Sequence, residues 1–102
     1  MIILLENESG DVNGDSTTMH VYPKIFAVWA DDFGGGTVSV EATPDGGTTW
    51  IPLTKNGIPL AYTANAIDQI SGLIAQGMHV RAVLSGSTLP VNVNAVLHEY
   101  LG

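Results

Sequence analysis

The chain has 102 residues, of which ten are acidic, three are basic and none is cysteine, and its formal net charge at pH 7 is −7. This length fits a single domain, and the charge opposes binding to nucleic acid or to anionic membrane surfaces, which both need clustered Lys and Arg. Without cysteine the chain has neither a disulfide framework nor a thiolate site for a metal or for redox chemistry.

Hydrophobic residues alternate with polar ones along most of the chain, and clusters of Gly, Pro, Asn and Asp separate the alternating segments. This pattern is typical of β-strands joined by tight turns. It predicts strands over residues 2–5, 17–21, 24–30, 37–43, 48–53, 60–64, 77–85 and 91–100. About seven or eight short strands favour an all-β fold, a single antiparallel β-sandwich of jelly-roll or immunoglobulin-like type.

The N-terminal segment has two parts that differ in polarity. The first part is apolar and consists of Ile2, Ile3, Leu4 and Leu5. It lacks the length and the basic flank of a signal peptide, and no apolar run reaches the ~20 residues of a membrane-spanning helix. We expect residues 1–16 to form an arm or first strand followed by an acidic loop, and residues 17–102 to form the body of the sandwich. As an arm, the apolar part would pair with a neighbouring subunit or with a shell of other proteins.

The strand predicted over residues 24–30 is apolar on both of its faces. Ile25, Ala27 and Trp29 share one face, whereas Phe26 and Val28 share the other. A strand of this kind is an inner strand of a sandwich or a strand that faces a neighbouring molecule.

Residues 58–76 carry two conflicting patterns. Apolar residues at positions 67, 70, 73 and 74 are spaced like one face of a helix, but Ser71 and Gly72 interrupt the spacing. We therefore expect a strand near residues 60–64, followed by irregular chain or one short helical turn.

The sharpest local motif is the segment Thr43–Trp50, which reads TPDGGTTW. It looks like an Asp-box, the Ser/Thr-x-Asp-x-Gly-x-Thr-Trp hairpin of sialidase-type propellers and of unrelated β-proteins. We expect Asp45 to accept backbone N–H groups inside the turn and Gly46 and Gly47 to adopt left-handed conformations. Trp50 is expected to pack against the base of the hairpin. Because one copy cannot build a propeller, the motif predicts a structural hairpin rather than a carbohydrate-active enzyme.

Three histidines have the donor atoms of a zinc site. His20, His79 and His98 lie on three different predicted strands, and no two of them have the short spacing of ligands on one helix or hairpin. We therefore predict strand histidines and no zinc.

The acidic segment near the N-terminus resembles the start of a calcium loop in one respect. Asp11, Asn13 and Asp15 alternate as in an EF-hand, but Gly14 falls at position four instead of position six, and Tyr22 stands at position twelve in place of the bidentate Glu. The segment is therefore no EF-hand, and a solvated acidic loop is the favoured interpretation over a loose calcium site.

No sequence motif for catalysis is present: the chain has no nucleophile elbow, phosphate loop or dinucleotide fingerprint. Asp31 and Asp32 are adjacent, so on a strand they would point to opposite faces instead of forming an acid/base pair. We predict a protein that is not an enzyme and binds no cofactor. Phe33, in the turn DDFGGG, is the best candidate for an exposed aromatic contact with sugar or protein.

The segment Gly36–Leu53 (GTVSVEATPDGGTTWIPL), followed by Gln76–Val93 (QGMHVRAVLSGSTLPVNV), resembles small β-sandwich virion proteins of tailed bacteriophages. The shared pattern is a Thr-Val-x-Val strand, a Pro-Asp-Gly-Gly-x-x-Trp hairpin and a Gly-x-x-Val-Arg-x-x-Leu-x-Gly hairpin. The resemblance implies a capsid decoration (cement) protein that binds the assembled major capsid shell, with a neck, tail or fibre accessory protein as the alternative. It implies neither catalysis nor a cofactor.

The composition suits a body that is partly covered by other proteins, because 45% of the residues are hydrophobic and only 13% are charged. We expect a location on the outer surface of a phage particle after synthesis in the host cytoplasm, with the major capsid protein or other virion proteins as partners. We also expect a homo-oligomer, taken as a trimer because capsid surfaces offer threefold sites. A carbohydrate-binding module is the alternative from another functional class.

Overall fold

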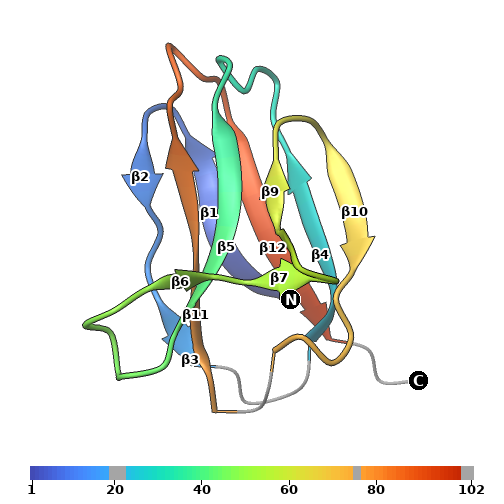
Figure 1. Ribbon diagram of the computed structural model, residues 1–102. Coiled ribbons are helices and arrows are strands. Elements are labelled where there is room, and N and C mark those ends of the chain that lie inside the picture. The colour runs from blue at the N-terminus through green and yellow to red at the C-terminus, as the bar shows by residue number, and fades with distance from the viewer. Residues whose placement is uncertain (19–22, 75–76, 100–102) are drawn as a thin grey trace.

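The computed structural model describes residues 1–18, 23–74 and 77–99, and these residues form antiparallel β-structure without a helix (Figure 1). Two sheets pack face to face, and a separate short hairpin lies at one edge (Figure 1). The predicted all-β sandwich is therefore confirmed. The strands are more numerous than expected, because short strands also form where turns or irregular chain were predicted, at Val12–Asn13, Thr54–Lys55, Ile58–Pro59 and Ala66–Gln69.

The two sheets are named A and B. Sheet A has four strands, in the spatial order β1 (Ile2–Glu8), β12 (Val93–Glu99), β4 (Pro23–Trp29) and β10 (Ala66–Gln69). The centre of sheet B consists of β11 (His79–Ser85) and β5 (Thr37–Thr43). Its margins consist of the short strands β2 (Val12–Asn13), β3 (Thr17–Thr18), β6 (Ile51–Pro52) and β9 (Ala61–Tyr62). The separate hairpin is formed by β7 (Thr54–Lys55) and β8 (Ile58–Pro59).

The hydrophobic core lies between the two sheets and consists of the inward-facing half of each alternating strand. Phe26 and Leu97 of sheet A and Val38 and Val80 of sheet B are completely buried. Burial of side chains of this size contributes roughly 1.5–3 kcal/mol each. Tyr62 closes one edge of the core, with its ring centroid 5.1 Å from that of Phe26.

The N-terminal segment is the first strand of the chain's own sandwich. β1 pairs along its length with β12, and a register shift between Ile3 and Leu5 lets the consecutive residues Leu4 and Leu5 both point into the core. The interpretation of residues 2–5 as an arm toward another molecule is therefore wrong for Leu4 and Leu5. The acidic loop is also shorter than predicted, because β1 continues to Glu8 and both β2 and β3 pair with β11.

Two expectations in the middle of the chain are only partly correct, for a common reason. The strand expected near residues 60–64 is present as β9 in sheet B, but the irregular chain or helical turn expected after it is preceded by another strand, β10 in sheet A. A turn then follows, with a hydrogen bond from the Leu73 N–H to the Ile70 carbonyl at 3.0 Å, and Ile67 is exposed whereas Ile70 is buried. Similarly, the strand expected over residues 48–53 is reduced to β6, because the turn before it extends to Trp50. In both places short strands change partners within a few residues.

Candidate interaction surfaces

The outer face of sheet A carries an apolar row that crosses all four strands. The strand registers place Ile3 opposite Val96, Val96 opposite Ala27, and Ala27 opposite Ile67. The two ends of the row are exposed, with 50% of Ile3 and 79% of Ile67 accessible to solvent, while Val96 and Ala27 between them are buried. Trp29, 43% exposed, follows Ala27 on the same face of β4. This surface, made by these five residues and Ile25, is called the neutral face below.

The neutral face is named for its charge. In the two rows that flank the apolar one, Ile25 is paired with His98 and Gln69, and Trp29 is paired with Asn94. None of these residues is an acid, a lysine or an arginine. On a chain with a net charge of −7, a partly exposed apolar surface without charged groups on β12, β4 and β10 is a candidate interaction site. The exposed Glu6 of β1 lies near its Ile3 end. The apolar pattern on both faces of β4 predicted an inner strand or a strand facing a neighbour, and β4 is an inner strand. On its outer side Trp29 is exposed, Ile25 is half-buried and Ala27 is buried.

A shallow groove of about 590 Å³ lies on the neutral face at the edge of sheet A. It is lined by Ala27, Val28, Trp29, Asn65, Ala66 and Ile67. The Asn65 amide oxygen accepts a hydrogen bond from the Ala30 backbone N–H at 3.0 Å, which fixes this side chain at the rim. The groove therefore offers one flat aromatic ring, one amide and otherwise apolar walls.

The Asp-box segment has the hydrogen bonds expected of such a hairpin. One carboxylate oxygen of Asp45 accepts the backbone N–H groups of Thr48 at 3.1 Å and Thr49 at 2.8 Å, and the Thr43 hydroxyl donates to the same oxygen. The backbone bond from Thr49 is the main cause that lowers the pKa of Asp45 to about 2. Gly47 has a φ of 112°, a conformation that favours glycine. These contacts assign the segment a structural role.

Trp50 is covered by a charged pair on the outer side of sheet B that the sequence analysis missed. Arg81 Nε donates to Glu41 Oε1 at 2.9 Å, and the guanidinium carbon lies 4.3 Å from the centroid of the Trp50 ring. Arg81 and Glu41 face each other in the register of β11 and β5, so correct pairing of these strands is the signal that would have revealed the contact. Because the guanidinium covers one face of the ring, Trp50 is a poor platform for sugar.

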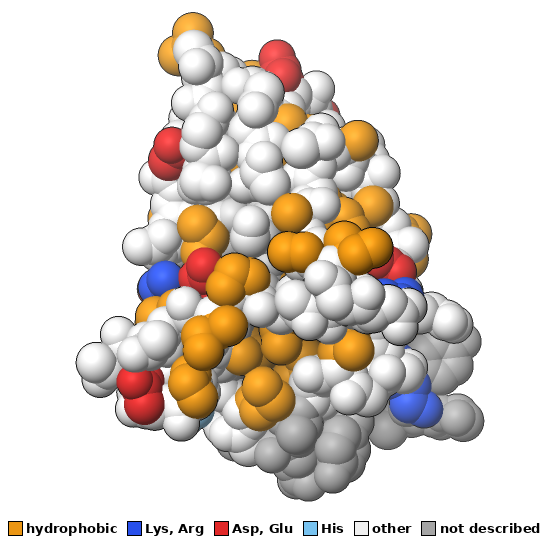
Figure 2. Space-filling view, viewed as in Figure 1, with side chains coloured by type: hydrophobic (Ala, Val, Ile, Leu, Met, Phe, Trp, Pro, Cys, Tyr) orange, Lys and Arg blue, Asp and Glu red, His pale blue; other side chains and the backbone are white. Residues whose placement is uncertain are grey.

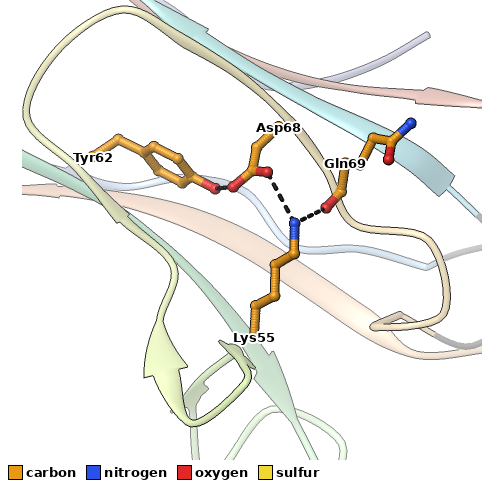
Figure 3. Close-up of polar contacts among 4 residues, drawn as sticks. All are labelled: Lys55, Tyr62, Asp68 and Gln69. Carbon is orange, nitrogen blue, oxygen red and sulfur yellow. Dashed lines mark hydrogen bonds and ion pairs between the residues drawn. The ribbon is translucent and has the colours of Figure 1, made fainter.

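Lys55, Tyr62 and Asp68 form a polar cluster between the two sheets (Figure 3). The Tyr62 hydroxyl donates to Asp68 at 2.9 Å, and Lys55 Nζ donates to Asp68 at 3.1 Å and to the Gln69 carbonyl at 2.7 Å (Figure 3). Burial and the bond to Asp68 raise the pKa of Tyr62, while the bonds from Tyr62 and Lys55 lower the pKa of Asp68. Tyr62 is therefore held protonated and Asp68 ionised. The cluster connects β7, β9 and β10 and thereby stabilises their arrangement. A tyrosine with a raised pKa is a poor general base, so a structural role suits the cluster better than acid/base chemistry.

The residues considered as metal ligands have other roles or lie apart. Asp11 accepts backbone bonds from Gly86 at 3.1 Å and Ser87 at 2.9 Å, and the Ser87 hydroxyl also donates to it. The hydroxyl bond is the main cause that lowers the pKa of Asp11. His79 and His98 lie on strands of different sheets, and His20 lies outside the described residues. Across residues 1–18, 23–74 and 77–99 no three His, Asp or Glu side chains are placed to hold a metal ion.

Phe33 is not the exposed contact that its place in a glycine-rich turn suggested. Its side chain is half-buried and packs against the hydrophobic core. The expectation that Phe33 is exposed is therefore wrong, while its contact with a partner stays a prediction. Among the aromatic residues that the structure describes, Trp29 is the exposed one.

A second apolar area lies on the opposite side of the molecule, over β6, β7 and β8 (Figure 2). Its exposed residues include Ile51 and Ile58. Unlike the neutral face, this area lies between two ion pairs, Arg81–Glu41 and Lys55–Asp68.

Comparison with protein-family models, with curated proteins and with solved structures finds no match for this chain. The described residues also contain no helix that is long and apolar enough to cross a membrane.

Proposed function

We propose that the chain is a structural virion protein of a tailed phage, a capsid decoration protein that binds the assembled major capsid shell and stabilises it. The resemblance of its hairpin motifs to small phage β-sandwich proteins supports the viral setting. The single observation that carries the interaction role is the neutral face, an uncharged apolar sheet surface on a strongly acidic chain. The proposed role involves no catalysis and no cofactor.

The proposed occupant of the neutral face is a second copy of this chain. Two chains that each carry a net charge of −7 repel each other, and this repulsion is weakest where the contact itself contains no carboxylate. A sheet face also packs well on a like face, at a separation of about 10 Å. Contact between like faces is a two-fold contact and makes a dimer. The trimer expected from capsid geometry would instead require the neutral face to meet a different surface of the next copy.

The size of the neutral face predicts weak association in solution. Four strands at ~4.8 Å spacing and ~3.3 Å per residue give a footprint of roughly 400 Å² per copy. Two such faces bury roughly 800 Å² in total, about half of the ~1,600 Å² in a typical stable complex. We therefore expect copies to associate reversibly when free and to be held together more firmly when both are bound to one shell.

Sedimentation of the full chain over a range of concentrations tests the self-association. We expect the average mass of the wild type to rise with concentration and Ile67→Thr to weaken association by at least ~10-fold, since it removes the most exposed apolar side chain of the face. Ile58→Thr is the matched control, because Ile58 is 69% exposed but lies on β8. Equal weakening by both variants, or a wild-type mass that stays monomeric at every concentration, overturns the assignment of the face.

Electron microscopy of purified particles tests the viral setting separately. A decoration protein gives density on the outer shell, and density at the neck, tail or fibre supports the alternative virion role. Absence of the protein from particles refutes both, while the sedimentation result stands by itself.

A carbohydrate-binding module is the second candidate, and the groove beside Trp29 favours it. An exposed aromatic ring next to a fixed amide, that of Asn65, is a suitable platform for a sugar ring. A glycan array with wild type and Trp29→Ala tests this candidate. Specific glycan binding that depends on Trp29 supports it, whereas Phe33→Ala is uninformative because Phe33 packs the core.

A further inference from the structure

The two loops at one end of the sandwich are joined into a single unit. They are the loop of residues 31–36, after β4, and the loop of residues 86–92, after β11, which both lie at the top of Figure 1. Four backbone hydrogen bonds connect them. Thr88 N–H donates to Gly34 O at 2.9 Å and Val91 N–H to Asp32 O at 2.8 Å, while Val91 O accepts from Asp31 N–H at 3.0 Å and from Asp32 N–H at 3.2 Å. Together these loops are called the tip below.

Glycines allow the two loops to come this close. A Cβ atom at Gly34 would lie 2.4 Å from the Thr88 carbonyl oxygen, and one at Gly36 would lie 2.7 Å from Ser87 Cβ. The first contact is with backbone, which cannot move aside as a flexible side chain does. The glycine run, which the sequence suggests is a flexible turn, is therefore the surface against which the second loop packs; it is called the glycine seat below. Asp11 holds the other side of this loop through its bonds to Gly86 and Ser87.

Leu89 projects from this rigid tip. It is 85% exposed, the highest value among the exposed large hydrophobic residues, and its φ of 50° lies in the left-handed region. This region is unfavourable for leucine and especially so before a proline, here Pro90. Such strain persists only where the surrounding contacts fix it, and it gathers at functional positions. Hydrophobic atoms accordingly form the uppermost point of the molecule above the β11–β12 connection (Figure 2).

The tip carries negative charge and no described cation. Asp11, Asp31 and Asp32 are exposed and accept hydrogen bonds from within the tip. Lys55 and Arg81 are paired with carboxylates elsewhere. Lys24 stands at the start of β4, at the far end of the strand that leads to Asp31. This charge opposes contact with a second copy, whose net charge is −7, and favours a basic partner.

We propose that the tip is a docking surface that inserts Leu89, with the exposed Val91 beside it, into an apolar pocket rimmed by Lys or Arg on a different protein. The rigid backbone presents the leucine without an ordering cost, and the carboxylates pair with the basic rim. The proposal deepens the proposed function, in which that protein is a component of the capsid shell. It assigns contact with the shell to the tip and contact between copies to the neutral face.

Site-specific photo-crosslinking tests the proposal. A photoreactive amino acid is placed at position 88, whose side chain is exposed, so that Leu89 remains intact in the full chain. The chain is then crosslinked in the cells or particles in which it occurs. We expect one discrete product with another protein, and a crosslinked peptide that contains apolar residues next to Lys or Arg.

Second substitutions in the same background supply the controls. Leu89→Asn removes the apolar contact while remaining compatible with the left-handed region, so we expect an unchanged or higher melting temperature and at least a tenfold lower crosslink yield. Ile58→Asn removes a comparably exposed isoleucine from another surface and should leave the yield unchanged. The double substitution Asp31→Asn and Asp32→Asn keeps an acceptor oxygen at each position, and should lower both the yield and its sensitivity to salt.

The outcomes separate the tip from the proposed function. A crosslink that depends on Leu89 and falls on a capsid protein supports both, whereas one on a protein that is not viral supports the tip and refutes the phage setting. No discrete product, a product only with a second copy, or equal yields with Leu89→Asn and Ile58→Asn overturn the tip proposal.

Discussion

Replacing Leu5 by alanine tests whether β1 belongs to the folded core. Leu5 is 2% exposed, sits opposite Ala95 in the register of β1 and β12, and is one of two consecutive leucines that the bulge directs inward. The substitution removes three carbon atoms, which at ~0.8 kcal/mol per methylene amounts to roughly 2.5 kcal/mol of lost burial. The cavity left behind raises the total to about 2–5 kcal/mol.

This loss is large compared with the whole stability of a small domain, about 5–15 kcal/mol. It corresponds to a decrease in Tm of at least ~8 °C for a chain of this size. Ile3→Ala is the matched control, because the same strand carries Ile3 on its outer face with half of the side chain exposed. We expect the control to cost about 1 kcal/mol or less. Urea unfolding followed by tryptophan fluorescence measures both variants, and equal midpoints for the two would show that β1 is an arm detached from the core.

Three further predictions concern the tip, the Asp-box and sheet B. Leu89→Asn should raise stability by up to about 1 kcal/mol, measured by thermal unfolding, because asparagine accepts the left-handed region better than leucine; a clear loss would contradict the strain. Asp45 has a pKa of about 2 in the folded chain, below the ordinary value of 3.8, so its contribution to stability is complete above about pH 4 and is lost as the pH falls toward 2. Asp45→Asn should therefore flatten the dependence of the urea midpoint on pH in this range, and an unchanged slope would refute the role of the carboxylate. Arg81→Met should cost about 1 kcal/mol and shift the emission of Trp50, and unchanged emission would exclude the stacked geometry.

The fold class could be predicted from the sequence because hydrophobic and polar residues alternate clearly along the long strands of a two-layer protein. Residues 24–30, 37–43, 77–85 and 91–100 match β4, β5, β11 and β12 closely, and these strands form the centres of both sheets. The Asp-box was equally readable, since its hydrogen bonds join residues within a few positions of one another.

Features that depend on contacts between segments far apart in the chain could not be predicted from the sequence. The bulge that buries both Leu4 and Leu5 breaks the period of two, and the glycine seat under Thr88 depends on two loops meeting from opposite sheets. The same limit explains the wrong expectation for Phe33, whose turn looks exposed until the second loop is placed against it. The apolar outer side of β4 was visible in the sequence, but whether neighbouring strands or a partner covered it depended on the strand order.

The positions of the two proposed surfaces restrict how copies can be arranged on a shell. The neutral face is parallel to the strands, whereas the tip lies at the end of the sandwich where β4 and β11 finish. Two like sheet faces pack with their strands within about 30° of each other. A two-fold axis that runs along the strands places both tips at the same end, so one dimer makes two contacts with the shell and gains avidity. An axis perpendicular to the strands directs the tips away from each other, and only one of them reaches the shell. The small neutral face is expected to give only weak self-association. This is sufficient for a decoration protein only in the first arrangement, where contacts with the shell and the contact between the two copies stabilise the same dimer.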